Sequence, residues 1–256
     1  MRMIDTHAHL FAEDFDDDLD DVIDRALTAG VVKILLPNID EKSINSLNST
    51  VRRHPDVFLP MMGLHPTSVT EKWKKQLEII YNELNSNNYI AIGEVGLDLY
   101  WDKSSLNIQQ AAFEQQLKWS VEKELPVSMH SRNAIKEVIA SIKRVDKKNI
   151  YGVFHSFGGS EEELENILQL ENFYVGVNGV VTFKNSGLDK VIKNCPLERL
   201  VIETDSPWLA PIPNRGKRNE SSYLTQIIKK LSSIYEIAEN DIAERTYINA
   251  RNVFNI

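Results

Sequence analysis

Five of the six histidines in this 256-residue chain follow short apolar segments. His7 and His9 end the first of these, the segment 3–10. Alternate residues of an extended segment point to the same side, so both imidazoles can approach one metal ion from one direction. An isolated pair of this kind is a weak indication, so the argument depends on where the other histidines fall. The others that follow apolar runs are His65, His130 and His155.

Two carboxylates hold similar positions, because Glu94 lies near the end of the apolar segment 89–96 and Asp205 follows the run 200–202. Imidazole and carboxylate ligands suit Zn²⁺ and Mn²⁺, and the carboxylates also admit Mg²⁺. The imidazoles of His7, His9, His130 and His155 and these two carboxylates make six ligands, more than one tetrahedral ion needs. We interpret them as a site for two divalent ions, bridged by Glu94. His7, His9 and Asp205 are assigned to one ion, and His130 and His155 to the other.

The segments that carry these residues alternate between two kinds of pattern. Short apolar runs predict strands at 3–10, 31–37, 58–63, 89–96, 125–129, 150–154, 173–177 and 200–202. Amphipathic spacing and capping signals predict helices between and after them. These helices are one that begins in the acidic run 16–21 and ends at Gly30, then 43–53, 73–84, 108–124, 134–145, one opened by the capping box 160–163, a short one around 188–192, 223–234 and 242–254.

Apolar strands without polar alternation are typical of a parallel sheet that is covered on both faces. Eight strand–helix units in this length predict a (β/α)8 TIM barrel, with residues 1–256 as a single domain. In such a barrel the carboxyl ends of all strands meet at one mouth. The predicted ligands would therefore lie together, although they are up to two hundred residues apart in the sequence.

The composition of the chain argues against several classes of protein. The net charge of −8 argues against a protein that coats duplex nucleic acid by bulk electrostatics, although a local basic rim remains compatible with it. No run approaches the roughly 18 apolar residues of a membrane span, so we expect no membrane association. The single cysteine, Cys195, forms no internal disulfide and is expected to be a packed thiol. With no secretory signal pattern at the N-terminus, we expect a cytoplasmic protein.

With these motifs in place, the chain resembles the TatD family of metal-dependent deoxyribonucleases, within the wider amidohydrolase-like barrel superfamily, over essentially its whole length. The motifs are Asp5-Thr6-His7-Ala8-His9, Gly63-Leu64-His65-Pro66, Gly93-Glu94-Val95-Gly96-Leu97-Asp98, His130-Ser131-Arg132, His155-Ser156-Phe157, Glu203-Thr204-Asp205-Ser206-Pro207 and Arg215-Gly216-Lys217-Arg218-Asn219-Glu220. The resemblance implies the same six metal ligands. Glu94, where related barrels bridge their metals with a carboxylated lysine, favours the phosphodiesterase branch over a cyclic amidase.

The chain departs from the family pattern at two places. Ser156 and Gly158 stand where members usually have Cys and Thr, and Ser221 stands where they usually have Pro. None of these three is a ligand, and they lie where they would shape the substrate cleft.

Several further residues are candidates for catalysis or substrate binding. Asp205 would orient the attacking water and accept its proton. Glu203 lies on the same face and would orient a histidine. His65 would donate to a phosphate oxygen or cap the turn before Pro66, and Asp98 is expected to be a structural acceptor. A basic rim would attract phosphates, and it consists of Arg132, Arg215, Lys217 and Arg218.

Tyr100 and Trp101 follow the fourth predicted strand. They would either stack on a nucleic-acid base or pack over the top of the barrel.

The leading hypothesis is a hydrolase that cleaves phosphodiester bonds of DNA, acting as an exonuclease. Two ions would lower the pKa of a shared water and hold the non-bridging phosphate oxygens. A pocket at the mouth of a barrel admits a strand end more readily than a continuous duplex, so single strands and strand ends are the expected partners. Two alternatives stay open: hydrolysis of the aminoacyl-tRNA ester at the same site, and a metal-binding partner protein without turnover.

Overall fold

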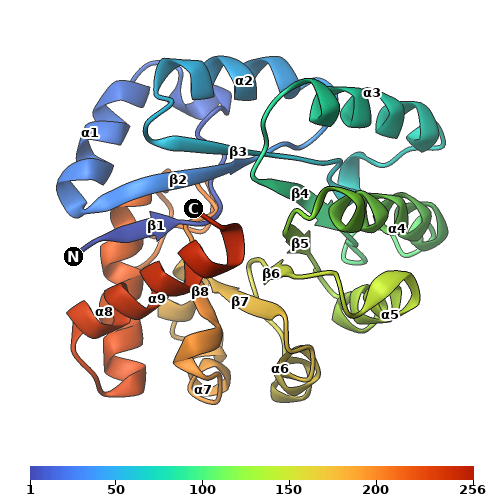
Figure 1. Ribbon diagram of the computed structural model, residues 1–256. Helices are drawn as coiled ribbons and strands as arrows, with labels where there is room; N and C mark the ends of the chain where they lie inside the picture. Colours follow the sequence, from blue (N-terminus) through green and yellow to red (C-terminus); the bar gives the residue numbers. More distant parts are fainter.

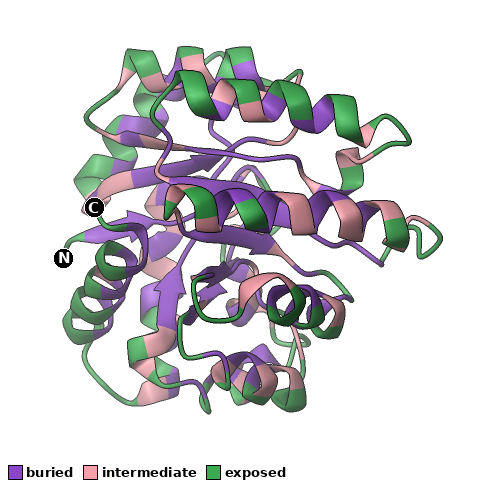
Figure 2. Cartoon of the chain, turned by 45° about the vertical axis from the view of Figure 1, so that its right-hand side comes forward, coloured by how far each residue is buried: buried purple, intermediate pink, exposed green.

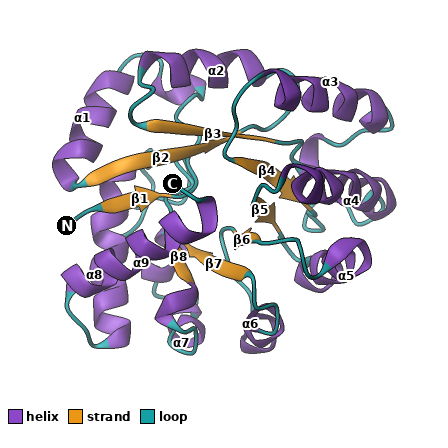
Figure 3. Ribbon diagram, viewed as in Figure 1, coloured by secondary structure: helices purple, strands orange, loops and turns teal.

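Eight parallel strands form one sheet in sequence order, and the helices surround it on the outside (Figures 1 and 3). The computed structural model describes residues 1–256. The strands are β1 (Met3–Asp5), β2 (Val31–Pro37), β3 (Phe58–Met62), β4 (Ala91–Gly96), β5 (Val127–His130), β6 (Gly152–Phe154), β7 (Phe173–Val177) and β8 (Leu200–Ile202). This arrangement confirms the predicted (β/α)8 barrel.

The helices alternate with the strands as expected. They are α1 (Leu19–Ala29), α2 (Ile44–Arg53), α3 (Trp73–Ser86), α4 (Leu106–Lys123), α5 (Ile135–Asp146), α6 (Glu161–Leu168), α7 (Leu188–Ile192), α8 (Leu224–Tyr235) and α9 (Glu239–Phe254). Short 3-10 turns lie at Glu13–Phe15, Pro66–Ser68, Gly179–Thr182, Leu197–Arg199 and Ser221–Tyr223. No helix is both long enough and apolar enough to cross a bilayer.

The barrel closes between β8 and β1 through the residues that follow these two strands. The Thr6 amide donates to the Ile202 carbonyl at 3.2 Å, and the Asp205 amide donates to the His7 carbonyl at 2.9 Å. Farther out, the His9 amide donates to the Ser206 carbonyl at 2.7 Å. The predicted ligands His7, His9 and Asp205 are therefore part of the seam that closes the barrel.

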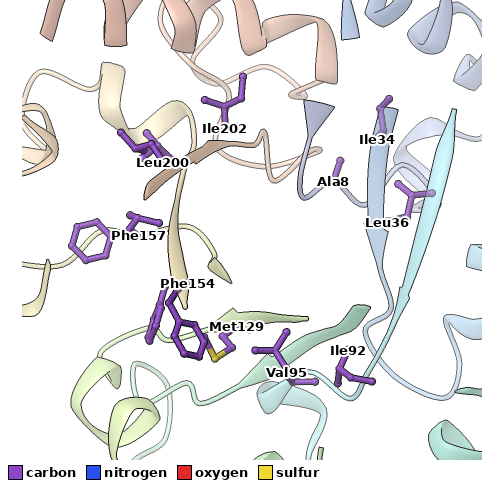
Figure 4. Close-up of a cluster of buried hydrophobic side chains, with 14 of the residues drawn as sticks. Ala8, Ile34, Leu36, Ile92, Val95, Met129, Phe154, Phe157, Leu200 and Ile202 are labelled. Atoms are coloured by element: carbon purple, nitrogen blue, oxygen red, sulfur yellow. The ribbon is translucent and has the colours of Figure 1, made fainter. Parts of the chain in front are cut away.

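Two buried clusters hold the barrel together. The larger one fills the space between strands and helices, and Figure 4 shows part of it, including Ile34 and Leu36 of β2. Leu35, between them in sequence, belongs to the second cluster, which joins residues of six strands to Val253 and Phe254 of α9. Because α9 contacts β1, β6 and β8, it lies across one end of the barrel (Figure 1). Burial follows the same division, with buried strands and exposed outer helix faces (Figure 2).

The structure corrects the expected start of the first helix. We predicted that the acidic run 16–21 opens it, but α1 begins at Leu19, and only Asp20 and Asp21 lie in its first turn. Asp18 makes no side-chain cap and instead accepts two hydrogen bonds from Arg218, at 2.7 and 2.6 Å. The capping box before α6 is confirmed: Ser160 and Glu163 each bond the other's backbone amide.

We expect Gly152→Ala to destabilise the barrel. Gly152 has a φ of +154°, which other residues rarely adopt, and an added Cβ would lie 2.0 Å from the Val127 carbonyl oxygen. The backbone conformation alone costs about 1–3 kcal/mol, so the urea midpoint should fall markedly. Gly158→Ala is the matched control, because its Cβ meets no atom within 4 Å. Equal midpoints for the two variants would contradict this account of the β5–β6 contact.

Candidate metal centre

Five imidazoles surround the buried carboxylate of Glu94, and they divide between its two oxygens. Oε2 lies 3.1 Å from His7 Nε2 and 3.6 Å from His9 Nε2. Oε1 lies 2.9 Å from His130 Nδ1, 3.1 Å from His155 Nε2 and 3.3 Å from His65 Nε2. Each oxygen thus faces its own group of nitrogen donors, the geometry expected of a carboxylate that bridges two ions.

Two of these histidines have their second ring nitrogen hydrogen-bonded to an oxygen on the outer side, and a third has a carboxylate beside it. His7 Nδ1 lies 3.2 Å from Ser128 Oγ, and His130 Nε2 lies 2.8 Å from Asp98 Oδ2. His155 Nδ1 lies 3.2 Å from Glu203 Oε1, within ion-pair range, but this buried nitrogen makes no hydrogen bond. An N–H directed to an outer oxygen leaves the lone pair of the other nitrogen directed inward, as in metal-bound histidines. Asp98 therefore sets the orientation of His130, whereas Glu203 places a negative charge beside the outer nitrogen of His155.

Asp205 and His9 complete the half of the site that faces Oε2. Asp205 Oδ1 lies 3.7 Å from His9 Nε2, and His7 and His9 bring their Nε2 atoms to 3.2 Å from each other. Asp205 adopts a left-handed backbone with φ of +58°, an uncommon conformation for a residue other than glycine. His9 Nδ1 is buried and has no hydrogen-bond partner.

His65 differs from the other four in what its outer nitrogen does. Its Nδ1 accepts a hydrogen bond from the Thr67 amide at 3.2 Å, and the Thr67 hydroxyl lies 2.7 Å away. A neutral imidazole that accepts at Nδ1 carries its proton on Nε2. With Nδ1 accepting, the inward nitrogen of His65 is a donor, which fits the predicted role toward a phosphate oxygen, and the bond from Thr67 fits the predicted turn cap. The same inward nitrogen also lies with Glu94 and His130 in a group that could hold a metal ion.

The charges in the site favour a bound cation. Burial lowers the pKa of His7 to about 4 and also lowers that of His9, so both are neutral, as metal ligands must be. Burial raises the pKa of Asp205 to about 7, so a neighbouring cation is needed to keep it ionised at neutral pH. Burial also opposes protonation of His155, but Glu94 and Glu203 raise its pKa well above the usual value, and a cation would displace that proton. The residues present therefore fit divalent metal.

The outer support of the site includes one carboxylate that the sequence did not single out. Asp5 is fully buried and accepts hydrogen bonds from the Thr204 amide and hydroxyl, at 2.9 and 2.6 Å, and from the Ser221 hydroxyl at 2.6 Å. It joins β1, the segment after β8 and the loop before α8 behind the ligands. Its position in the Asp5-Thr6-His7 motif was the available signal.

The predicted basic rim is only partly at the site. Arg132 lines a cavity of about 850 Å³ above the metal centre. Arg215, Lys217 and Arg218 do not line it. Arg218 pairs with Asp18 and lies over the ring of Phe15, and the guanidinium of Arg215 lies 4.5 Å from the centre of the Phe183 ring. Arg218 is thus part of the structure that holds the loop before α8.

That loop is held by three further contacts. The Asn219 side chain donates to the carbonyls of Thr204 and Trp208, at 2.8 and 2.7 Å. Glu220 accepts from Arg25 of α1, with Nη2 to Oε2 at 2.6 Å. The basic motif after β8 therefore stabilises the loop beside the barrel mouth, and its cations do not line the cavity.

Of the three residues that depart from the family pattern, Ser156 and Gly158 line the cavity, whereas Ser221 is buried and does not, contrary to what we expected of it. Ser156 Oγ accepts from Asn178 Nδ2 at 2.6 Å, and its amide donates to Glu203. Gly158 lines the cavity with open space in front of it. Ser221 is one of the donors to Asp5. Two of the three are thus hydrogen-bonded parts of the site's support.

Comparison with known proteins gives consistent matches over the whole chain. The family model described as "TatD related DNase" matches residues 4–255. A Bacillus subtilis protein named "Uncharacterized metal-dependent hydrolase YabD" is 36% identical over 99% of both chains. The "3'-5' ssDNA/RNA exonuclease TatD" of Erwinia tasmaniensis is 33% identical over 99% of this chain and 100% of its own. The crystal structure of YjjV, a TatD homologue from Escherichia coli, superposes with a TM-score of 0.91 at 29% identity, covering 100% of this chain and 98% of that one.

We expect Glu203→Gln to weaken metal binding by roughly 10- to 100-fold, the usual effect of removing a partner that orients a ligand. The substitution keeps the size of the side chain but removes the charge that faces His155. Competition with a chelator of known affinity measures the change. Glu198→Gln, on an exposed side chain outside the site, is the control. Unchanged affinity in Glu203→Gln would show that His155 does not need this partner.

Proposed function

This chain belongs to the TatD related DNase family of metal-dependent hydrolases, and from that premise we propose that it hydrolyses phosphodiester bonds of DNA using two divalent ions. One observation carries the proposal. The two oxygens of Glu94 face separate groups of histidines, so a single buried carboxylate is in position to join two ions. The candidate ions are Zn²⁺, Mg²⁺ and Mn²⁺, which suit imidazole and carboxylate ligands.

The proposed ligands divide into two sets, one for each ion. His7, His9 and Asp205 would hold one ion, and His130 and His155 the other. When bound, the ions supply an acidified water as nucleophile and neutralise charge on the phosphate oxygens.

The remaining residues act around that reaction. Asp205, whose burial favours proton uptake, accepts the proton of the attacking water. His65 offers its Nε2 proton to a phosphate oxygen, and Arg132 offers its guanidinium from the cavity wall. Glu203 acts by holding His155 rather than by touching the substrate.

A single strand or a strand end is the proposed substrate. The centre lies at the floor of a cavity in the barrel mouth, and most of its ligands are buried. A free end can reach such a floor, whereas a continuous duplex would have to bend into it. The Erwinia relative is named as an exonuclease of single-stranded DNA and RNA, which supports the same assignment.

The test is the purified protein with 5′-labelled single-stranded DNA and Mg²⁺ or Mn²⁺, with and without EDTA. We expect stepwise shortening that EDTA abolishes, and about two equivalents of metal per chain. Glu94→Ala should lose activity and metal while keeping its circular dichroism spectrum, because the ligand lies at the strand ends rather than in the packed layers. A folded Glu94→Ala protein that cleaves at a near-normal rate would refute the bridging role.

Two results would redirect the proposal. If aminoacyl-tRNA is deacylated with a larger kcat/KM than DNA is cleaved in the same preparation, the ester is the substrate. If the protein retains no metal and hydrolyses neither substrate, a binding role without turnover replaces the enzyme.

Asp205→Asn separates the two roles of Asp205. Asparagine keeps one oxygen for the metal but cannot accept a proton at neutral pH, so metal binding should fall modestly. The rate should fall by about 10²- to 10⁴-fold, the range of general-base contributions. Turnover is measured at increasing Mn²⁺ up to saturation, where we expect no rescue. Recovery to near wild-type turnover would mean that Asp205 is only a ligand and that another group takes the proton.

A further inference from the structure

The exposed aromatic side chains of this protein all gather at one place. Nine large apolar side chains are exposed, and three of them are aromatic: Tyr100, Trp101 and Trp208. All three line the cavity above the metal centre, and none of the six aliphatic ones does. Trp101 is 74% exposed, so it forgoes most of the stabilisation that burying an indole would give. Packing over the barrel top, the alternative left open by the sequence, does not account for that exposure.

The three aromatics form two platforms on opposite sides of the barrel. Tyr100 and Trp101 lie in the loop after β4, and their rings are 4.8 Å apart. Trp208 lies in the loop after β8, with its ring 5.2 Å from that of His9. In the sheet order β4 and β8 are half a turn apart. The metal centre therefore lies between the two platforms.

Each platform is tied to the metal centre by a short hydrogen bond. The Tyr100 amide donates to Asp98 Oδ1 at 2.9 Å, while the other oxygen of Asp98 holds His130. The Trp208 amide donates to the carbonyl of Asp205 at 2.9 Å. The backbones of both loops are thus held beside the ligands, which anchors the aromatic residues next to the metal centre.

Arg132 adds the charge that a nucleotide needs beside a ring. Its guanidinium lies 3.6 Å from the centre of the Tyr100 ring and 5.6 Å from that of Trp101. The guanidinium covers one face of Tyr100, so Trp101 supplies the more open ring of the pair for a base. The N–H groups at the edge of the guanidinium stay free and can bind a phosphate. Aromatic faces together with a cationic side chain are the usual means of holding single-stranded nucleic acid without sequence preference.

We infer that Trp208 and the Tyr100–Trp101 pair are base-stacking platforms that select single-stranded nucleic acid by holding an unpaired base on each side of the scissile phosphate. Duplex bases are already stacked on their neighbours, so they cannot occupy the platforms without unstacking. This inference rests on the proposed phosphodiesterase function and adds to it the group that is recognised, the exposed face of a base.

The experiment asks whether the effect of removing an aromatic ring from the protein depends on the presence of one particular base in the DNA. The probes are a 5′-labelled thymidine decamer and versions of it with one abasic position, moved along the strand, all with Mn²⁺. Trp208→Ala should lower kcat/KM on the decamer by roughly 5- to 150-fold, the fold-change that corresponds to one stacked base, mostly through KM. Trp208→Phe, which keeps an aromatic face, should retain most of the activity.

Non-additivity is the decisive result. For one abasic position, the wild type should lose about as much kcat/KM as Trp208→Ala loses on the intact decamer. Trp208→Ala acting on that abasic probe should then show little further loss. Trp101→Ala should show the same behaviour at a different position. The ratio of single-strand to duplex cleavage should also fall in both variants. Ile79→Ala, an exposed apolar residue of α3 outside the cavity, is the control and should change nothing.

The outcomes separate the inference from its premise. If the wild type with metal does not shorten the decamer, the proposed function fails. If it shortens the decamer but the ring and base effects add at every position, the stacking inference is wrong and the function stands. Metal content is measured for every variant, and a loss of metal in Trp208→Ala would assign Trp208 to the support of His9 instead.

Discussion

The metal centre is built around one buried carboxylate, Glu94, that five imidazoles share. A charged Glu94 in the barrel interior would be costly without partners, and the histidines around it hold its pKa well below the usual value against the opposing effect of burial. No single strand supplies those partners. They come from the segments after β1 and β3 and from the ends of β5 and β6, so the charge is compensated only when the barrel is closed. A site made this way requires the whole fold, and metal binding is thereby linked to folding.

The outer neighbours of the histidines decide what each one can do. His130 and His65 face the same oxygen of Glu94, yet an acceptor stands behind the first and a donor behind the second. A carboxylate acceptor leaves a lone pair directed inward, and an amide donor leaves a proton there. Identical side chains at similar distances are therefore oriented differently, His130 to offer a lone pair and His65 to offer a proton. This difference is set by Asp98 and Thr67, neither of which faces Glu94 itself.

The sequence predicted the barrel and brought the six ligand candidates together, because strand ends meet at one mouth and histidines after apolar runs can be recognised locally. It did not reveal the partners of those residues. Arg218 resembled a free rim cation, but it pairs with Asp18, two hundred residues earlier. The supporting role of Asp5 was not predicted, because its hydrogen-bond donors Thr204 and Ser221 lie about two hundred residues away in the sequence. Local sequence patterns indicate whether a segment is a helix or a strand and where it ends. Pairing between residues of distant loops depends on the closed fold and cannot be predicted from such patterns.

An acidic enzyme for a polyanion must attract its substrate by something other than bulk charge. The chain carries a net charge of −8, and of the predicted rim only Arg132 lines the cavity. Long-range steering is therefore weak, and the attraction has to arise at contact, where a stacked base and an Arg132–phosphate pair act over a few ångströms. These contacts favour a base that is already unstacked over one that must first leave a duplex. Single-strand preference, in the proposed enzyme, then follows from the charge balance of the protein as much as from the shape of its cavity.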